Sequence, residues 1–146
     1  LFEASAAVAS ELAGGKCIEN AKSFGKNFGI AYQLRNDYLD YFGDESETGK
    51  NIIEDLSEGK STLPLIHSYL NSNSDDKKIL LEIFEGKILT KSDVLLDIFK
   101  RNNSDVYTRD KIKEYSDAAI ESLGMLSGES KQSLIDLTQF CSQRSK

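Results

Sequence analysis

The sequence predicts an all-α fold, and three observations support this prediction. The 146 residues include a single proline and only ten glycines, whereas Leu, Ile, Ala, Glu and Lys, which form helices readily, are frequent. Apolar residues recur at helical spacing over long stretches. Residues typical of helix starts and helix ends separate these stretches, and no stretch shows the alternation of a strand. We therefore expect one domain of helices joined by short loops.

The first two helices are expected over residues 1–13 and 18–42. Gly14 and Gly15 stand between them, and glycine takes the left-handed conformation that ends helices. The stretch 43–60 is polar, acidic and punctuated by glycines, so we expect a structured loop there, with at most a short helix over 52–56.

Four residues of the second helix carry a packing prediction. Phe24 and Phe28 follow the helical spacing and are expected in the core, although such aromatic side chains also suit the wall of a hydrocarbon pocket. Gly25 and Gly29 are four residues apart and allow another helix to approach closely.

Capping residues predict where the later helices begin. We expect Ser61 and Ser74 to be N-caps, Pro64 to lie in a first helical turn, and Thr90 to open a capping box with Asp93 in place of the usual Glu. The expected helices are 61–70, 74–84, 90–100, 107–126 and a last one from 129 through 143.

The charge of the chain excludes some classes of partner. A net charge of −6 and a pI near 4.9 argue against binding to nucleic acid or to an anionic membrane surface. No apolar run approaches the ~18 residues of a membrane-spanning helix. Cys17 and Cys141 show no metal-ligand spacing and are expected to be reduced thiols in a cytoplasmic protein, with one disulfide as the alternative.

Acidic residues concentrate in one part of the sequence. The stretch from Arg35 to Lys60 contains eight of the 24 acidic residues and three basic residues, so its net charge is −5. Such a run is usually a solvated face. Here, however, Gln33, Asn36, Asp37 and Asp40 share one face of the expected helix. Oxygen ligands in this arrangement suit Mg²⁺, which takes one or two protein carboxylates and completes its shell with water and phosphate oxygens.

Two lysines follow the acidic positions, and each comes directly after a glycine. The pairs are Gly49-Lys50 and Gly59-Lys60. Glycine lets a backbone approach a ligand closely, and a lysine ammonium is a flexible point charge for phosphate oxygens. Together with the acidic helix face, these residues predict a site for a metal-bridged diphosphate.

The residues over 29–65 form a recognisable pattern. An aromatic-Gln pair is followed by Asn-Asp-x-x-Asp, a Gly-Lys, an Asp-Leu and a Gly-Lys-x-Thr. This stretch resembles the second aspartate-rich region of the trans-isoprenyl (polyprenyl) diphosphate synthases. The start of the chain at Leu1-Phe2-Glu3 and its basic end resemble the same family more weakly.

The resemblance implies a fold and a reaction. It implies a helical bundle of the isoprenoid synthase type, present as a partial bundle, with residues 1–146 as the C-terminal part of a single domain whose N-terminal half is absent. The family condenses an allylic prenyl diphosphate with isopentenyl diphosphate and releases pyrophosphate, with Mg²⁺ as cofactor. It further implies a homodimer, or else a partner that carries the missing half.

The resemblance also assigns roles to individual residues. The metal-binding motif falls on Asn36, Asp37 and Asp40. Lys50 and Lys60 match lysines that contact the allylic diphosphate, and Tyr32 and Gln33 match residues beside the reacting double bond. The implied catalytic residues are Gln33, Lys50 and Lys60; the implied substrate-binding residues are Tyr32, Gln33, Lys50 and Lys60.

Two departures from the family pattern keep other functions open. Asn36 stands where the family usually has a metal-binding Asp, and an amide offers an oxygen without charge. The family's first aspartate-rich motif lies in the half that is absent, so the chain alone is expected to be inactive. The alternatives are a non-catalytic regulatory or scaffold subunit of a heteromeric synthase, and a terpene cyclase or peptide prenyltransferase.

Two further sets of side chains carry expectations. His67 has no second His or Cys near it in the sequence and is expected to be a half-exposed structural residue. Arg144 and Lys146 are expected to be tail charges, with closure over the diphosphate as the alternative.

Overall fold

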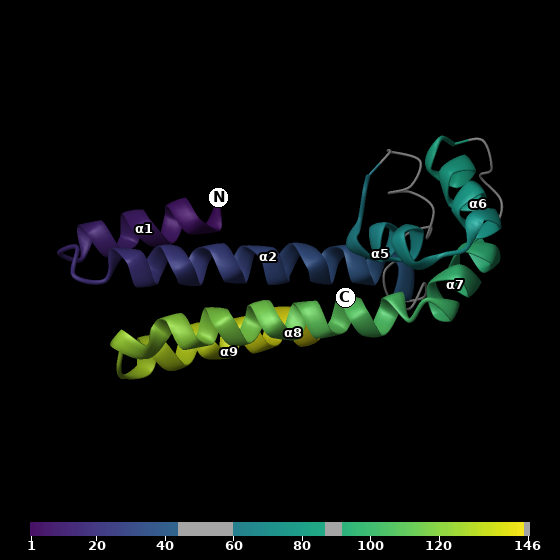
Figure 1. Cartoon of the computed structure of the whole chain (residues 1–146). Coiled ribbons are helices and arrows are strands. Elements are labelled where there is room, and N and C mark those ends of the chain that lie inside the picture. Colours follow the sequence, from purple (N-terminus) through teal and green to yellow (C-terminus); the bar gives the residue numbers. More distant parts are fainter. Residues whose placement is uncertain (44–59, 87–91, 145–146) are drawn as a thin grey trace. The chain divides into compact units, whose positions relative to one another are not determined.

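The structure is a computed structural model that describes residues 1–43, 60–86 and 92–144, and these residues confirm the all-α prediction (Figure 1). No strand occurs within the described ranges. The expected loop with its short helix over 52–56 and the Thr90 end of the expected capping box lie outside them. The elements are α1 (Phe2–Leu12), α2 (Ile18–Phe42), α5 (Leu63–Asn71), α6 (Ser74–Phe84), α7 (Ser92–Arg101), α8 (Ser104–Ser122), the 3₁₀ turn η1 (Leu123–Met125) and α9 (Glu129–Gln143).

The chain divides into two compact units. Unit 1 comprises Leu1–Arg35 and Asp110–Arg144, and unit 2 comprises Asn36–Arg109. The division therefore falls inside α2 and inside α8, so unit 1 is built from both early and late parts of the chain.

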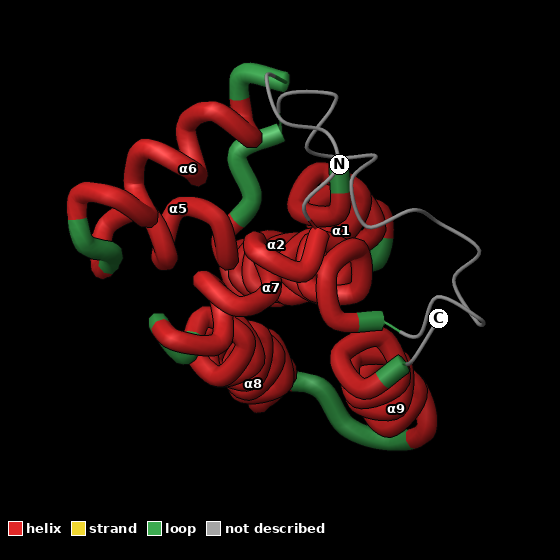
Figure 2. Tube along the Cα trace, turned by 90° about the vertical axis from the view of Figure 1, so that its right-hand side faces the viewer, coloured by secondary structure: helices red, strands yellow, loops and turns green. Residues whose placement is uncertain are grey.

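Unit 1 is held together by an apolar core to which all four of its helices contribute. Phe24 and Phe28 of α2 pack with Ala119 and Leu123, and all four side chains are buried. Ala6 of α1 and three residues of α9 pack against them: Leu134, Ile135 and Cys141. The expectation that Phe24 and Phe28 are core residues is confirmed. Figures 1 and 2 show α1 lying along α2 in this unit.

The glycine pair of α2 allows α1 to approach. A Cβ on Gly25 would lie 2.5 Å from the Phe2 carbonyl oxygen and 2.8 Å from the Glu3 Cα, both backbone atoms. A Cβ on Gly29 would lie 3.1 Å from the Phe2 ring. The predicted close helix approach at these glycines is confirmed. Gly14 and Gly15, with φ of +100° and +72°, end α1 in the predicted left-handed conformation.

Unit 2 has its own core, centred on α7. Leu95, Ile98 and Phe99 are fully buried and pack against Tyr41, at the end of α2, and against α5 and α6. The Tyr41 and Phe99 rings meet edge to face, with centroids 5.2 Å apart. This core fixes the last turns of α2, which carry the predicted metal-binding residues.

Two N-caps lie one residue away from their predicted positions. The cap of α5 is Thr62, and its hydroxyl donates to the Tyr41 hydroxyl at 3.0 Å, so it makes no capping hydrogen bond. The cap of α6 is Asn73, whose Oδ1 accepts from the Asp76 backbone N–H at 2.9 Å. The predictions of Ser61 and Ser74 were therefore wrong by one residue, whereas Pro64 does lie in the first turn of α5.

Helix α8 begins three residues earlier than its apolar spacing predicted. Asn103 takes a left-handed φ of +52°, at the point where the chain turns from α7 into α8. Its carbonyl accepts from the Tyr107 N–H at 3.0 Å and thus starts α8. The same helix ends at Ser122, earlier than the predicted 126, because the chain tightens into η1.

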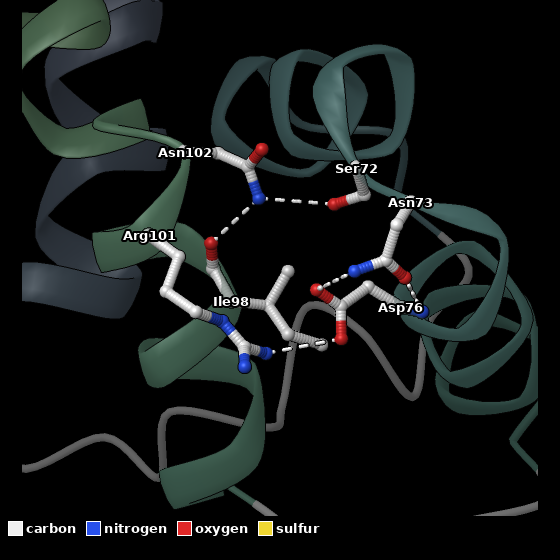
Figure 3. Close-up of polar contacts among 6 residues, drawn as sticks. All are labelled: Ser72, Asn73, Asp76, Ile98, Arg101 and Asn102. Carbon is white, nitrogen blue, oxygen red and sulfur yellow. Dashed lines mark hydrogen bonds and ion pairs between the residues drawn. The ribbon is translucent and has the colours of Figure 1, made fainter.

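A network of polar side chains joins the α5–α6 turn to the end of α7 (Figure 3). Asn102 donates to the Ser72 hydroxyl at 2.9 Å and to the Ile98 carbonyl at 2.8 Å. Arg101 donates to Asp76 at 3.0 Å, and Asn73 caps α6 from the other side. The Asn73 cap thus satisfies the Asp76 N–H at the start of α6, whereas the Ile98 carbonyl, which already accepts from the Asn102 backbone N–H at 3.1 Å, gains a second donor.

None of the described helices combines the length and the apolar character that crossing a membrane requires.

Candidate functional site

Helix α2 carries five of the predicted site residues. It runs without interruption from Ile18 to Phe42, so the helical spacing on which the site prediction depends is present. Tyr32 and Gln33 belong to unit 1, whereas Asn36, Asp37 and Asp40 belong to unit 2.

The predicted metal-binding residues lie beside the unit 2 core. Leu39 and Tyr41, on either side of Asp40 in the sequence, are buried, with exposed fractions of 9% and 2%. Asn36, Asp37 and Asp40 themselves are half-buried. Since Asp40 follows Asp37 by three residues and Asn36 by four, the three side chains share one face of the helix.

This donor set fits Mg²⁺ but is not a complete cage. Two carboxylates and one amide oxygen match the one or two protein carboxylates with which Mg²⁺ is typically held. Within the described ranges, no three His, Cys, Asp or Glu side chains come together as a metal site. Any Mg²⁺ held here would therefore take its remaining oxygens from water and substrate.

Of the two predicted lysines, the structure describes Lys60 but not Lys50. Lys60 is exposed and lies two residues before Thr62, the buried N-cap of α5. The hydrogen bond between Thr62 and Tyr41 ties the chain after Lys60 to the end of α2 within unit 2. Lys50 lies outside the described residues.

Tyr32 and Gln33 line an open cavity in unit 1. This cavity of about 520 Å³ is walled by the start of α1 and by α2, with Phe2, Gly29 and Ile30 among its apolar walls. Gln33 is exposed, whereas Tyr32 is half-buried against Phe2, with ring centroids 5.4 Å apart. The Gln33 amide therefore lies at a cavity whose walls are mostly apolar but also include Glu3 and Lys26.

A second cavity in unit 1, of about 510 Å³, faces a different side of α2. It is lined by α1, α9 and the α2 residues Phe24 and Phe28, so these two rings are at once core residues and cavity walls. At roughly 100° per residue, they lie about 140–180° around the helix from Gln33. Gln33 is not among the residues that line this apolar space, although Phe2 and Gly25 line both cavities.

The prediction that Arg144 is a tail charge was wrong, and sequence reasoning also missed the contacts of Arg35; Lys146 lies outside the described residues. The Arg144 guanidinium lies over the Tyr32 ring, 4.8 Å from its centroid. Arg35 of α2 donates hydrogen bonds to backbone carbonyls at the end of α9. Arg35 and Arg144 are 109 positions apart in the sequence, and helical periodicity cannot indicate a contact over such a separation.

His67 is a structural residue of unit 2, as predicted. Its Nδ1 lies 2.9 Å from the Ser104 hydroxyl, which in turn lies 2.5 Å from the Ser68 hydroxyl. The imidazole stacks on Tyr107, with centroids 4.0 Å apart. Burial lowers the pKa of His67 from its ordinary value of 6.5.

The two cysteines agree with the prediction of reduced thiols. Cys17 and Cys141 are both half-buried, and neither forms a disulfide. The alternative of one disulfide is therefore not what the structure contains.

Comparison with known proteins gives a consistent result. The chain is 36% identical to the geranylgeranyl diphosphate synthase of Saccharolobus solfataricus over 152 aligned residues, which cover 100% of this chain and 46% of that protein. It is also 36% identical to the octaprenyl diphosphate synthase of Haemophilus influenzae, covering 94% of this chain and 43% of that one. The chain thus spans about half the length of the curated relatives it matches.

Solved structures match the same fold. The polyprenyl synthase of Caulobacter crescentus, crystallised with calcium and isoprenyl diphosphate, superposes with a TM-score of 0.85 at 27% identity, over 99% of this chain and 46% of that one. The geranylgeranyl pyrophosphate synthetase of Pyrococcus horikoshii gives a TM-score of 0.79 at 32% identity, over 87% of this chain and 39% of that one. The polyprenyl synthetase family model matches residues 1–102. The chain therefore belongs to the polyprenyl synthetase family.

Proposed function

We propose that this chain provides the diphosphate-binding wall of a Mg²⁺-dependent prenyltransferase. The reaction condenses an allylic prenyl diphosphate with isopentenyl diphosphate to give a longer polyprenyl diphosphate and pyrophosphate. The proposal depends on one observation, which is that α2 carries an aromatic-Gln pair and, over the next two turns, an Asn and two Asp side chains on one helix face. Each of these positions matches the family's second aspartate-rich region, with Asn36 as the one change of residue.

The proposed metal site consists of Asn36, Asp37 and Asp40. Bound Mg²⁺ would supply positive charge against the diphosphate as it leaves the allylic carbon. Because these side chains are only half-buried, substrate and water oxygens have access to complete the coordination.

The remaining residues act on the substrates themselves. Lys60, and Lys50 by the resemblance, neutralise the leaving diphosphate with ammonium groups. Tyr32 and Gln33 lie along the prenyl carbon chain, where an aromatic ring favours a nearby carbocation. The open cavity beside Gln33 offers apolar walls to the prenyl carbon chain, and keeping water away from the cation would need the remaining walls of the site.

We propose that this site is one wall only. The relatives are about twice as long, so residues 1–146 are taken as the C-terminal part of one synthase domain that needs an N-terminal half for turnover. That half would come from the same polypeptide or from a partner. The cytoplasm is the proposed compartment, in line with the two free thiols, and a homodimer is the proposed assembly.

A complementation assay tests this proposal. The chain is incubated with Mg²⁺, radiolabelled isopentenyl diphosphate and an allylic diphosphate, first alone and then with the unmatched N-terminal half of the Saccharolobus solfataricus relative. We expect no steady product from the chain alone and prenyl transfer from the mixture. Steady turnover by the chain alone would contradict the one-wall proposal, whereas inactivity of a mixture shown to associate would contradict the proposed reaction.

A second candidate function is favoured by Asn36. A regulatory or scaffold subunit would keep the fold but lose a metal-binding carboxylate, and Asn36 is such a loss. In this case the mixture would associate without product, and replacing Asn36 with Asp would restore turnover. Asp37, Asp40 and Lys60 are more than a scaffold requires, so we rank this function second.

A further inference from the structure

Arg35 binds the carboxyl end of α9 within unit 1. Its Nε donates to the Arg144 carbonyl oxygen at 2.9 Å, and its Nη2 donates to the same oxygen and to the Gln143 carbonyl at 3.4 Å. The last carbonyls of a helix lack partners inside the helix and carry partial negative charge. A guanidinium, with several donors in a rigid plane, is well suited to bind two of them at once.

The backbone leaves the helix at the residue that Arg35 holds. The Arg144 N–H still donates to the Phe140 carbonyl at 2.9 Å, as in a helix, but its ψ of 146° is extended. The carbonyl of Arg144 is thereby turned away from the helix ladder and accepts from Arg35 instead. The backbone of this residue is therefore held from two sides, by α9 and by Arg35.

The side chain of the same residue covers Tyr32. Its guanidinium carbon is 4.8 Å from the Tyr32 ring centroid, well inside the range of a cation–π contact, and the side chain is half-buried. The Tyr32 ring also packs against Phe2 and Phe28, with centroids 5.4 Å and 6.3 Å away. Phe2 belongs to α1 and Phe28 to α2, whereas Arg144 brings the end of α9 to the same ring.

We propose that Arg35 is a positioning residue that fixes Tyr32 through Arg144. By holding the end of α9, Arg35 seats the Arg144 guanidinium on the ring that, under the proposed function, lies beside the reacting prenyl chain. We name these contacts the Arg35–Arg144 latch. A simple helix-capping role for Arg35 would stabilise α9 but leave the environment of Tyr32 unchanged, so the two roles can be separated by a measurement at Tyr32.

A fluorescence reporter at position 32 tests the latch without any need for turnover. The chain contains no tryptophan, so Tyr32→Trp introduces a single indole fluorophore. In this background, Arg144→Gln uncovers the ring, and we expect its emission to shift to longer wavelength. Arg35→Gln is expected to give the same shift, and the double variant no more than Arg144→Gln alone, because Arg35 acts through Arg144.

Two further variants serve as controls for the fluorescence measurement. Arg109→Gln removes an exposed arginine of α8 that pairs with Asp105, and it should leave the emission unchanged. Arg35→Lys keeps the charge but not the planar fork, and it should give an intermediate shift in case Arg35→Gln does not fold by circular dichroism. The latch is wrong if folded Arg35 variants leave the indole emission at its starting value, or if the shifts of Arg35 and Arg144 variants add.

An activity arm separates the latch from the proposed function, on which its role in the reaction rests. In the complemented enzyme with native Tyr32, Arg35→Lys should lower kcat more than it raises the KM for the allylic diphosphate, since an aromatic ring attracts the carbocation of the transition state more strongly than the neutral allylic chain of the ground state. If no variant, including the parent, transfers prenyl groups, the proposed function fails, while the emission shifts still decide the latch. If the parent is active and Arg35→Lys equals it in kcat, the latch does not serve the reaction.

Discussion

At the scale of single residues, the metal-binding prediction depends on Asn36. The amide leaves the site with two carboxylates, Asp37 and Asp40, where the related pattern has three. A third carboxylate adds attraction for a divalent cation in a half-buried position, where charges are only partly screened. Asn36→Asp should therefore tighten Mg²⁺-dependent binding of pyrophosphate about tenfold, as measured by calorimetry.

A matched control comes from the same helix. Asn20→Asp adds the same charge at an exposed position of α2 outside the predicted motif, and should leave pyrophosphate binding unchanged. Equal effects of the two substitutions would mean that Asn36 has no special part in metal binding.

His67 carries a prediction about pH. Burial lowers its pKa in the folded chain, whereas the unfolded chain has the ordinary value of 6.5. Below that value the unfolded state holds more protons than the folded state, so the free energy of unfolding falls as the pH drops through and below about 6.5. Urea unfolding between about pH 8 and pH 5 should show this decline. His67→Gln should remove much of this decline in the free energy of unfolding. If the free energy of unfolding fell equally with pH in the parent and in the His67→Gln variant, the assignment to His67 would be contradicted.

Individual residues also show what the sequence leaves open. The identity of the predicted metal-binding and substrate-binding residues on α2 follows from spacing along one helix, and that helix is present as predicted. The contact of Arg144 with Tyr32 joins residues from the end of α9 and from α2, far apart in the chain. Helical periodicity is a local signal, so it could not indicate this pair.

At the scale of secondary structure, α1 and α2 make the sharpest packing prediction. Gly25→Ala would place a Cβ 2.5 Å from the Phe2 carbonyl oxygen, a backbone atom that cannot move without shifting α1. We expect a loss of about 1–3 kcal/mol in the free energy of unfolding, measured by urea denaturation. Gly29→Ala should cost less, because its Cβ would meet the Phe2 side chain at 3.1 Å, and a side chain can adjust.

Gly124 provides the control for this pair. It lies in η1, its Cβ would meet no atom within 4 Å, and its φ is not left-handed. Gly124→Ala should change the stability by less than about 0.5 kcal/mol. If Gly25→Ala were equally neutral, the close approach of α1 to α2 would be contradicted.

The start of α6 allows a comparison of two kinds of contact (Figure 3). Asn73 caps the helix by accepting from the Asp76 N–H, whereas the Arg101–Asp76 ion pair involves an arginine side chain that is 61% exposed. We expect Asn73→Ala to cost about 1 kcal/mol and Arg101→Gln less than about 0.5 kcal/mol in urea unfolding. The reverse order would show that the ion pair, and not the cap, holds the α5–α6 turn.

Element boundaries were predictable to within a few residues, and the differences have physical causes. The predicted range of α2 agrees with the structure because strong apolar spacing and flanking glycines delimit it. The cap of α5 moved to Thr62, whose hydroxyl is engaged by Tyr41 in a tertiary contact. The start of α8 moved because Asn103 adopts a left-handed conformation, which asparagine tolerates but which its sequence context did not require.

At the scale of the whole molecule, the all-α class and the family were predictable, because one dense motif over residues 29–65 carries the resemblance. The division into two compact units was not, since its boundaries fall within α2 and α8, where no change in composition or loop marks them. Each unit has its own apolar core, and the predicted site residues of α2 are divided between the two units.

The proposed function depends on the binding of a diphosphate to this chain through Mg²⁺. Isothermal titration of the 146-residue chain with inorganic pyrophosphate, with and without millimolar Mg²⁺, tests it most directly. We expect binding heat only when Mg²⁺ is present, and weaker binding after Lys60→Ala but not after Lys78→Ala, a control that removes another exposed lysine. Absence of heat under both conditions, or binding that is indifferent to Mg²⁺ and to Lys60, would contradict the claim.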